Sequence, residues 1–283
     1  MHVDTALDWR ADALQQQLAA LLPGIGVEVQ AQLASTNTTL LERARAGTAA
    51  AGRPLLLVAE HQTAGRGRLG RGWVAQPGAS LTFSLLLPLA PASWAGLSLA
   101  VGCALADALE PAATTATAPR LALKWPNDLW LLDAPGHGRK LGGILIETVA
   151  AGAQRLAVVG VGLNVLPQPQ ADAGQLTHGL ASTQELDPTS TAPGVLATVA
   201  GPLVRALQRF EAEGFAPFHA AFARRDLLAG QALATAGAEP LLQGRGEGVD
   251  VDGALLLRSA DGALHRISSG EVSVRLQPDP TPC

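Results

Sequence analysis

The chain has 283 residues, which is more than one average domain and less than two full ones. With 48% hydrophobic and 16% charged residues, and with no apolar stretch long enough to span a bilayer, it is predicted to be globular and not a transmembrane protein. The net charge of −4 argues against a general nucleic-acid binder, and the N-terminus lacks a secretion pattern, so we expect a cytoplasmic protein.

Hydrophobic periodicity predicts a series of helices and strands along the chain. In chain order these are helix 11–22, strand 27–33, a helix capped by Ser35 or Thr36 that runs to about 45, strands 53–60 and 80–88, helix 93–110, strands 121–128, 140–149 and 155–165, and helices 193–213 and 215–225. From about 228 onward, short strands alternate with glycine turns.

The order of these elements predicts an α+β fold. Most strands are followed directly by strands, which favours a mixed β-sheet covered by helices, placed on one side, over a doubly wound parallel sheet. The short C-terminal strands predict a small β-barrel. We therefore expect a catalytic domain over 1–227 and a small β-barrel domain over 228–283.

The segment EHQTAGRGRLGRGW, residues 60–73, carries three arginines between glycines. It matches the dinucleotide pattern G-x-G-x-x-G, but the residues that follow cannot sustain the helix that this pattern requires. A cationic loop that closes over a carboxylate or phosphate is the preferred interpretation. A solvated Arg/Gly loop is the alternative.

Lysine is almost absent from the chain, because 18 of its 20 basic residues are arginine. The two lysines, Lys124 and Lys140, are therefore candidates for a task that needs a compact ammonium group. Lys124 opens the segment Lys-Trp-Pro-Asn-Asp, which suits a nucleotide and its magnesium ion, although an ordinary Pro-Asn-Asp turn is the alternative.

Two further strands contain glycines that clear space for a close approach of another group. They are Lys140 to Glu147, with Gly142 and Gly143, and Gly160 to Asn164. Taken alone, each would be a bulged strand. The histidine spacing predicts no zinc pair, and no serine-hydrolase elbow or Walker P-loop is present in the sequence.

Four segments in one order resemble the catalytic domain of biotin-protein ligases. They are Ser35 to Asn37, Gln62 to Trp73, Lys124 to Asp128 and Lys140 to Glu147. The resemblance implies a class II synthetase-like fold of the biotin/lipoate ligase type, with an SH3-like barrel at the C-terminus. It also implies a two-step reaction, in which biotin and ATP form biotinyl-5'-AMP and a lysine of a biotin carrier domain, such as that of acetyl-CoA carboxylase, then accepts the biotin.

The resemblance also implies roles for individual residues. It assigns catalysis to Arg66, Arg68 and Lys140, and biotin binding to Ser35, Thr36, Asn37, Gln62, Arg66, Gly67, Arg68, Lys140, Gly142 and Gly143. It assigns nucleotide binding to Trp73, Lys124, Asn127, Asp128, Asn164, Glu271 and Arg275, with Asp128 as a ligand of Mg²⁺. Biotin and ATP with Mg²⁺ are then substrates and ion, and no tightly bound prosthetic group is implied.

Alternative functions remain at this point. They are a lipoate-protein ligase, a non-catalytic biotin-binding regulator and an Arg/Gly RNA-binding module. Only about 34 residues precede Ser35 and they show no recognition-helix pattern, so we expect the single-function form of the ligase, without DNA binding. A homodimer follows from the resemblance alone.

Overall fold

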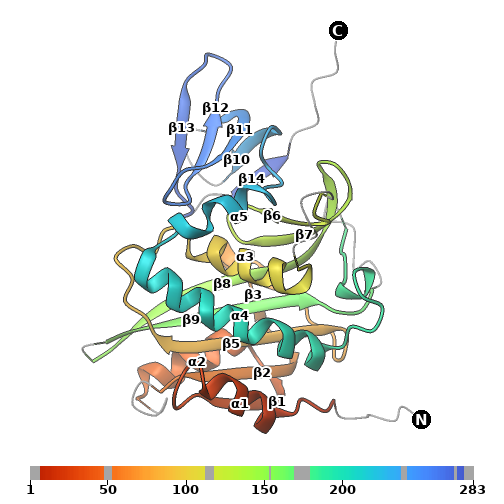
Figure 1. Cartoon of the computed structure of the whole chain (residues 1–283), viewed down its shortest axis with the longest axis vertical. Helices are drawn as coiled ribbons and strands as arrows, with labels where there is room; N and C mark the ends of the chain where they lie inside the picture. The colour runs from red at the N-terminus through yellow and green to blue at the C-terminus, as the bar shows by residue number, and fades with distance from the viewer. Residues whose placement is uncertain are drawn as a thin grey trace. The chain divides into compact units, whose positions relative to one another are not determined.

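The computed structural model describes residues 7–47, 53–111, 118–152, 154–168, 179–236, 241–270 and 273–276. Its internal contacts divide the chain into two compact units. Unit 1 comprises residues 1–90 and 141–205, and unit 2 comprises residues 91–140 and 206–283. The two units are described in turn (Figure 1).

Unit 1 is built on five strands in the order β1-β2-β5-β9-β8. These strands are β1 (Gly26–Leu33), β2 (Leu55–Gln62), β5 (Ser80–Pro88), β9 (Gln154–Asn164) and β8 (His137–Ala151), of which β8 enters unit 1 at Leu141. β1 and β2 are parallel, whereas β2, β5, β9 and β8 pair antiparallel. The predicted mixed sheet is confirmed.

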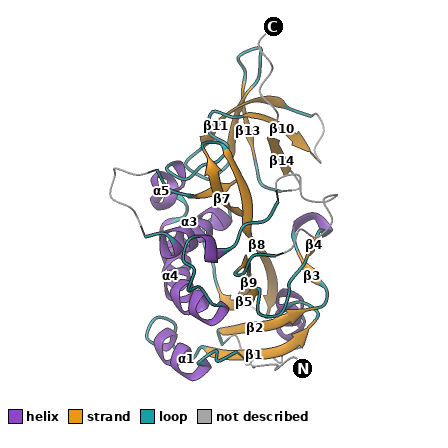
Figure 2. Cartoon of the chain, turned by 90° about the vertical axis from the view of Figure 1, so that its right-hand side faces the viewer, coloured by secondary structure: helices purple, strands orange, loops and turns teal. Residues whose placement is uncertain are grey.

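Helices cover both faces of this sheet. Successive side chains of a strand point to opposite faces, and in β5 and β9 both sets of side chains are buried. α2 (Thr36–Arg45) packs its Leu40 and Leu41 on a face that includes Leu57 and Val158. The opposite face is covered by α1 (Ala11–Ala19) and the beginning of α4 (Ala192–Glu213), which lie in front of the sheet in Figure 1, with α2 behind it. Figure 2 shows the same layering from the side. The expectation of helices on one side is therefore wrong, because the strands are apolar on both faces.

The described part of unit 1 also contains a short hairpin and two 3₁₀ turns. β3 (Gly65–Arg66) pairs antiparallel with β4 (Gly72–Trp73), and the turn η2 (Arg68–Gly70) lies between them. After β9, the turn η3 (Thr183–Glu185) is closed by a capping box between Ser182 and Glu185.

The described part of unit 2 holds the β6–β7 hairpin, the end of α4, further helices and a second sheet. β6 (Leu121–Lys124) pairs antiparallel with β7 (Asp128–Ala134), so the strand expected over 121–128 ends at Lys124, where the cis Trp125–Pro126 bond begins the turn. The helix expected over 93–110 is α3 (Leu97–Leu109), because Gly96 has a φ of 81° and precedes it. The helix expected over 215–225 is split at Pro217 into η4 (Ala216–Phe218) and α5 (His219–Ala223).

The C-terminal strands form a five-stranded antiparallel sheet in the order β13-β12-β11-β10-β14. They are β10 (Ala232–Ala236), β11 (Gln243–Val249), β12 (Leu255–Arg258), β13 (Leu264–Ile267) and β14 (Ser273–Leu276). This sheet agrees with the predicted small SH3-like domain. The domain boundary at 227/228 stays a prediction.

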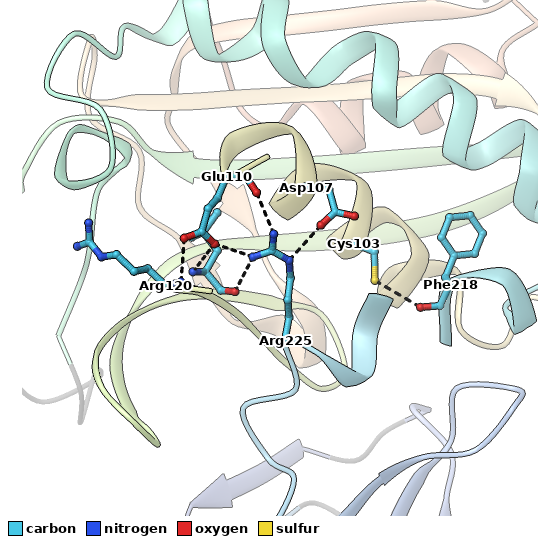
Figure 3. Close-up of polar contacts among 7 residues, drawn as sticks. Cys103, Asp107, Glu110, Arg120, Phe218 and Arg225 are labelled. Carbon is cyan, nitrogen blue, oxygen red and sulfur yellow. Dashed lines mark hydrogen bonds and ion pairs between the residues drawn. The ribbon is translucent and has the colours of Figure 1, made fainter. Parts of the chain in front are cut away.

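A buried arginine connects three segments of unit 2 (Figure 3). Arg225 is 7% exposed and donates to Asp107, to the side chain and backbone carbonyl of Glu110, and to the carbonyl of Leu121. Burial raises the pKa of Glu110, but hydrogen bonds from the backbone N–H groups of Arg120 and Leu121 and from Arg225 outweigh it, and the pKa is lowered. The cluster fixes the end of α3 to the start of β6 and to the segment after α5.

Candidate active site

The N-terminal turn of α2 carries three of the residues expected to bind biotin. Ser35 is the N-cap and its side chain accepts from the N–H of Thr38 at 3.5 Å, which confirms the predicted cap. Gln62, at the end of β2, accepts from the backbone N–H of Thr36 at 2.7 Å and from its hydroxyl at 3.2 Å. The hydroxyl of Ser84 lies 2.6 Å from that of Thr36. The end of β2 and the start of α2 therefore form one polar cluster on the sheet.

Asn37 sits at the centre of this cluster and is only 3% exposed. Its amide nitrogen donates to the carbonyl of Leu145 at 3.1 Å and to the carboxylate of Glu147 at 2.9 Å, and its oxygen accepts from Ser84 at 2.6 Å. A Cβ at Gly160 would lie 2.1 Å from the Asn37 oxygen. Gly160 thus clears space for a side chain of the protein itself. The contact of Asn37 with biotin stays a prediction.

Arg66, at the end of β3, lies against the same turn of α2. Its Nη1 is 3.2 Å from Oε1 of Glu147 and 3.5 Å from Oγ1 of Thr38. The side chain is 48% exposed, whereas that of Glu147 is 24% exposed. The first arginine of the Gly-Arg loop is therefore held beside the residues expected to bind biotin, with part of its guanidinium open to solvent.

The Gly-Arg segment does not open a helix, as its sequence predicts. After Gly67 it forms only the three-residue turn η2, which begins at Arg68 and in which Leu69 has a φ of 56°. The indole ring of Trp73 packs directly on Gly162 of β9, because a Cβ at Gly162 would lie 2.5 Å from it. Gly162 in β9 is therefore needed for the packing of Trp73. The contact of Trp73 with adenine stays a prediction.

The remaining predicted residues of unit 1 lie on β8 and β9. Gly142 and Gly143 are paired in register with Leu163 and Gly162, and a Cβ at Gly142 would lie 2.6 Å from the carbonyl oxygen of Gly162. Asn164 is 2% exposed and donates to the carbonyl of Ala181 at 3.1 Å, so its amide connects the end of β9 to a later segment.

Four predicted residues gather around the β6–β7 hairpin of unit 2. Lys124 and Asp128 are register partners on either side of the turn that contains Asn127, and the ammonium of Lys124 lies 5.0 Å from the centre of the Trp130 ring. Lys140 pairs with Asp128 at 2.8 Å, with both side chains 23% exposed. Asp128 thus holds the ammonium of Lys140 and is also the register partner of Lys124 at the end of the hairpin.

One predicted residue, Arg275, belongs to the C-terminal sheet. Arg275 is an exposed residue of β14 and faces Ala234 of β10 in register. Glu271 lies outside the described residues.

Two polar residues of the unit 1 cluster received no role from the sequence. Ser84 and Glu147 are the side chains that join Thr36, Asn37 and Arg66 to one another. Each follows an apolar residue in a largely apolar stretch of its strand, Phe83 in β5 and Ile146 in β8, and this pattern was the available signal.

Within the described part of the chain, no three His, Cys, Asp or Glu residues lie together as a metal site made by protein side chains alone would require. No helix there is long and apolar enough to cross a membrane.

Known proteins resemble this chain over most of its length. Residues 29–164 match the biotin/lipoate A/B protein ligase family, and residues 233–275 match the biotin protein ligase C-terminal domain. The bifunctional ligase/repressor BirA of Salmonella typhimurium is 32% identical over 97% of this chain and 87% of its own length. The biotin–acetyl-CoA-carboxylase ligase of Paracoccus denitrificans is 34% identical over 81% of this chain and 94% of its own.

Solved structures extend the likeness to the fold. The biotin protein ligase from Aquifex aeolicus in complex with biotin and ATP is 28% identical, with a TM-score of 0.70 over 89% of this chain and 99% of that one. With relatives above 30% identity that are matched over most of their length, the chain belongs to the biotin protein ligase family.

Proposed function

We propose that this protein is an ATP-dependent, AMP-forming ligase that activates biotin as biotinyl-5'-AMP and transfers it to a lysine of a carrier domain such as that of acetyl-CoA carboxylase. The observation that carries the proposal is the position of Arg66 beside Thr38 and Glu147, at the N-terminal turn of α2, where Glu147 also accepts from Asn37. This places the cation of the loop next to the polar cluster expected to bind biotin, in a chain of the ligase family.

The chemistry explains why the site is cationic. Biotin carboxylate and ATP are both anions, so charge repulsion opposes the attack on the α-phosphate and negative charge grows on the phosphoryl group. Fixed cations lower that barrier. Arg66 and Arg68 act on the biotin carboxylate and the adenylate phosphate, with the backbone of Gly67 between them. In unit 1 the uncharged end of biotin is bound by Ser35, Thr36, Asn37 and Gln62, and by the backbone of Gly142 and Gly143.

Lys124, Asn127, Asp128 and Lys140 serve the nucleotide phosphates, and Lys140 also contacts the reacting carboxylate. The donor set fits Mg²⁺, because this ion binds one or two carboxylates together with substrate phosphates, and Asp128 supplies one carboxylate. When bound with ATP, Mg²⁺ neutralises phosphate charge. Trp73, Asn164, Glu271 and Arg275 complete the nucleotide contacts.

The second step needs no covalent enzyme nucleophile, because the acceptor amine attacks the mixed anhydride of biotin and AMP directly. The bond between the biotin carbonyl and the phosphate oxygen breaks, AMP leaves and an amide forms. The adenylate is readily hydrolysed, so water must be kept out until the carrier docks.

Further properties follow from the same proposal. The protein works in the cytoplasm, where its carrier is made, and the net charge of −4 disfavours binding to DNA. The catalytic domain is assigned to 1–227 and the small β-barrel domain to 228–283. A homodimer stays a prediction.

The test is transfer of labelled biotin to a purified carrier domain with ATP and Mg²⁺, with Lys140→Ala as the paired variant. We expect ATP-dependent labelling of the carrier by the parent protein and a loss of about a hundred-fold or more in Lys140→Ala, because a fixed cation at the reacting carboxylate and phosphate is removed. Lipoate replaces biotin in a parallel reaction. Labelling with lipoate alone would establish the lipoate ligase, and biotin binding without pyrophosphate release would establish a regulator.

A further inference from the structure

Glu147 lies where the polar cluster of α2 meets the Gly-Arg loop. Its Oε2 accepts from the amide of Asn37 at 2.9 Å, and its Oε1 is 3.2 Å from Nη1 of Arg66. We propose that Glu147 is a positioning residue, whose carboxylate sets Arg66 for the anionic end of the ligand and fixes Asn37 at the same time. The proposal rests on the function proposed above.

Glu147 ends a continuous chain of polar contacts. Gln62 accepts from Thr36, the hydroxyl of Thr36 lies 2.6 Å from that of Ser84, and Ser84 donates to Asn37. Asn37 then donates to Glu147, which pairs with Arg66. This series of polar contacts joins the residues expected at the uncharged end of biotin to the arginine expected at its carboxylate. Glu147 is the last link on which the position of Arg66 depends.

Only a carboxylate satisfies both neighbours of Glu147. Asn37 already donates its other amide hydrogen to the carbonyl of Leu145, so it presents a donor to Glu147, and Arg66 also presents a donor. A carboxylate accepts on both oxygens, whereas a glutamine amide accepts on one and donates on the other. The change Glu147→Gln therefore satisfies either Asn37 or Arg66 and sets a donor against the other.

Arg66 keeps donors for a ligand while it is held. Its contacts with Glu147 and Thr38 both use Nη1, and the side chain remains 48% exposed. A guanidinium has five N–H donors in a fixed fork, so the Nε and Nη2 edge can receive a carboxylate or phosphate without breaking the pair. Glu147 therefore orients Arg66 and does not compete with the ligand for it.

The experiment measures biotin-dependent exchange of labelled pyrophosphate into ATP by the full chain, at a series of biotin concentrations. For Glu147→Gln we expect the KM for biotin to rise about ten-fold and kcat to change by less than about three-fold, because the variant loses one half-exposed hydrogen bond between charged groups. In an Arg66→Ala background, the same change should alter the KM by less than about two-fold, because the two residues act as a pair.

The matched control is Glu28→Gln. Glu28 in β1 pairs with Arg43 of α2 at 2.7 Å, so this variant also removes one carboxylate and one ion pair between α2 and the sheet, without contact with the loop. Its KM should match that of the parent. If Glu147→Gln does not fold, Glu147→Asp, which is one methylene shorter and reaches one partner only, should raise the KM similarly.

The outcomes separate the two proposals. A parent protein that exchanges pyrophosphate together with a Glu147→Gln variant of unchanged KM would overturn the positioning role and leave the ligase function intact. A lower kcat at constant KM would assign Glu147 to stability alone and also overturn the role. A parent protein without biotin-dependent exchange would overturn both.

Discussion

The contact between Gly160 and Asn37 gives the most direct test of how the sequence builds the site. In Gly160→Ala the new Cβ would lie 2.1 Å from the Asn37 oxygen and 2.8 Å from its Cγ. A relaxed contact between carbon and oxygen is about 3.3 Å, so Asn37 must withdraw by about 1.2 Å. Asn37 comes from α2 and Gly160 from β9, both of which are well packed, so the side chain rather than the backbone has to yield.

The withdrawal breaks three hydrogen bonds of Asn37, to Ser84, to the carbonyl of Leu145 and to Glu147. A neutral hydrogen bond contributes about 1 kcal/mol and one to a charged group about 2 kcal/mol, and the groups left behind are buried. The smaller chain entropy of alanine in the unfolded state offsets about 0.5 kcal/mol. We therefore expect Gly160→Ala to lower the free energy of unfolding by about 3.5 kcal/mol.

The assay is urea unfolding followed by tryptophan fluorescence and far-UV circular dichroism. Gly72→Ala is the control, because nothing lies within 4 Å of a Cβ at that position, and its stability should stay within about 0.5 kcal/mol of the parent. In an Asn37→Ala background the added methyl group fills vacated space, so Gly160→Ala should then cost less than about 1 kcal/mol. Additive costs in this double-mutant cycle would refute the explanation.

Two further predictions concern buried charges in unit 2. Burial raises the pKa of Asp226 to about 6, although the backbone N–H group of Leu228 donates to its carboxylate and opposes the shift. The contribution of the protonated Asp226 to stability is therefore complete below about pH 4 and is lost as the pH rises through about 6. Asp226→Asn should therefore gain stability over the parent between pH 4.5 and 7, on the order of 2 kcal/mol, in urea unfolding at each pH; parallel pH curves would contradict this. Arg225→Ala removes a buried cation and leaves the partly buried carboxylate of Glu110 without its partner, which should cost about 3 kcal/mol. Arg10→Ala removes an exposed ion pair and should cost less than about 1 kcal/mol. Equal losses of stability in the two variants, measured by thermal unfolding, would show that burial of the cluster does not matter.

Local sequence signals predicted most of the secondary structure. The apolar run 80–88 became β5 over the same residues, and Ser35 became the cap of α2, because burial and capping act within a few residues. The ends of elements were less predictable where proline or glycine imposes a backbone geometry. Pro126 ended β6 at Lys124, and Gly96 delayed the start of α3.

Contacts between distant residues could not be predicted in the same way. The sequence indicated that Gly160 and Gly162 clear space, but the groups that fill it, Asn37 and Trp73, come from segments far away along the chain. Likewise, the polar residue Ser84 looked like an interruption of a core strand, and only the fold shows it between Thr36 and Asn37. A chain of hydrogen bonds of this kind depends on strand register, which one sequence does not specify.

The placement of Trp73 over Gly162 has a consequence for measurement. β9 lies between β5 and β8, and at Gly162 its cover on one face is an indole that belongs to the Gly-Arg hairpin. When that hairpin shifts, the backbone of β9 at Gly162, which has no side chain to cover it, becomes exposed to solvent. Deuterium uptake by a peptide that spans 158–164 therefore acts as a gauge of hairpin position, readable without a label and in the presence of any ligand.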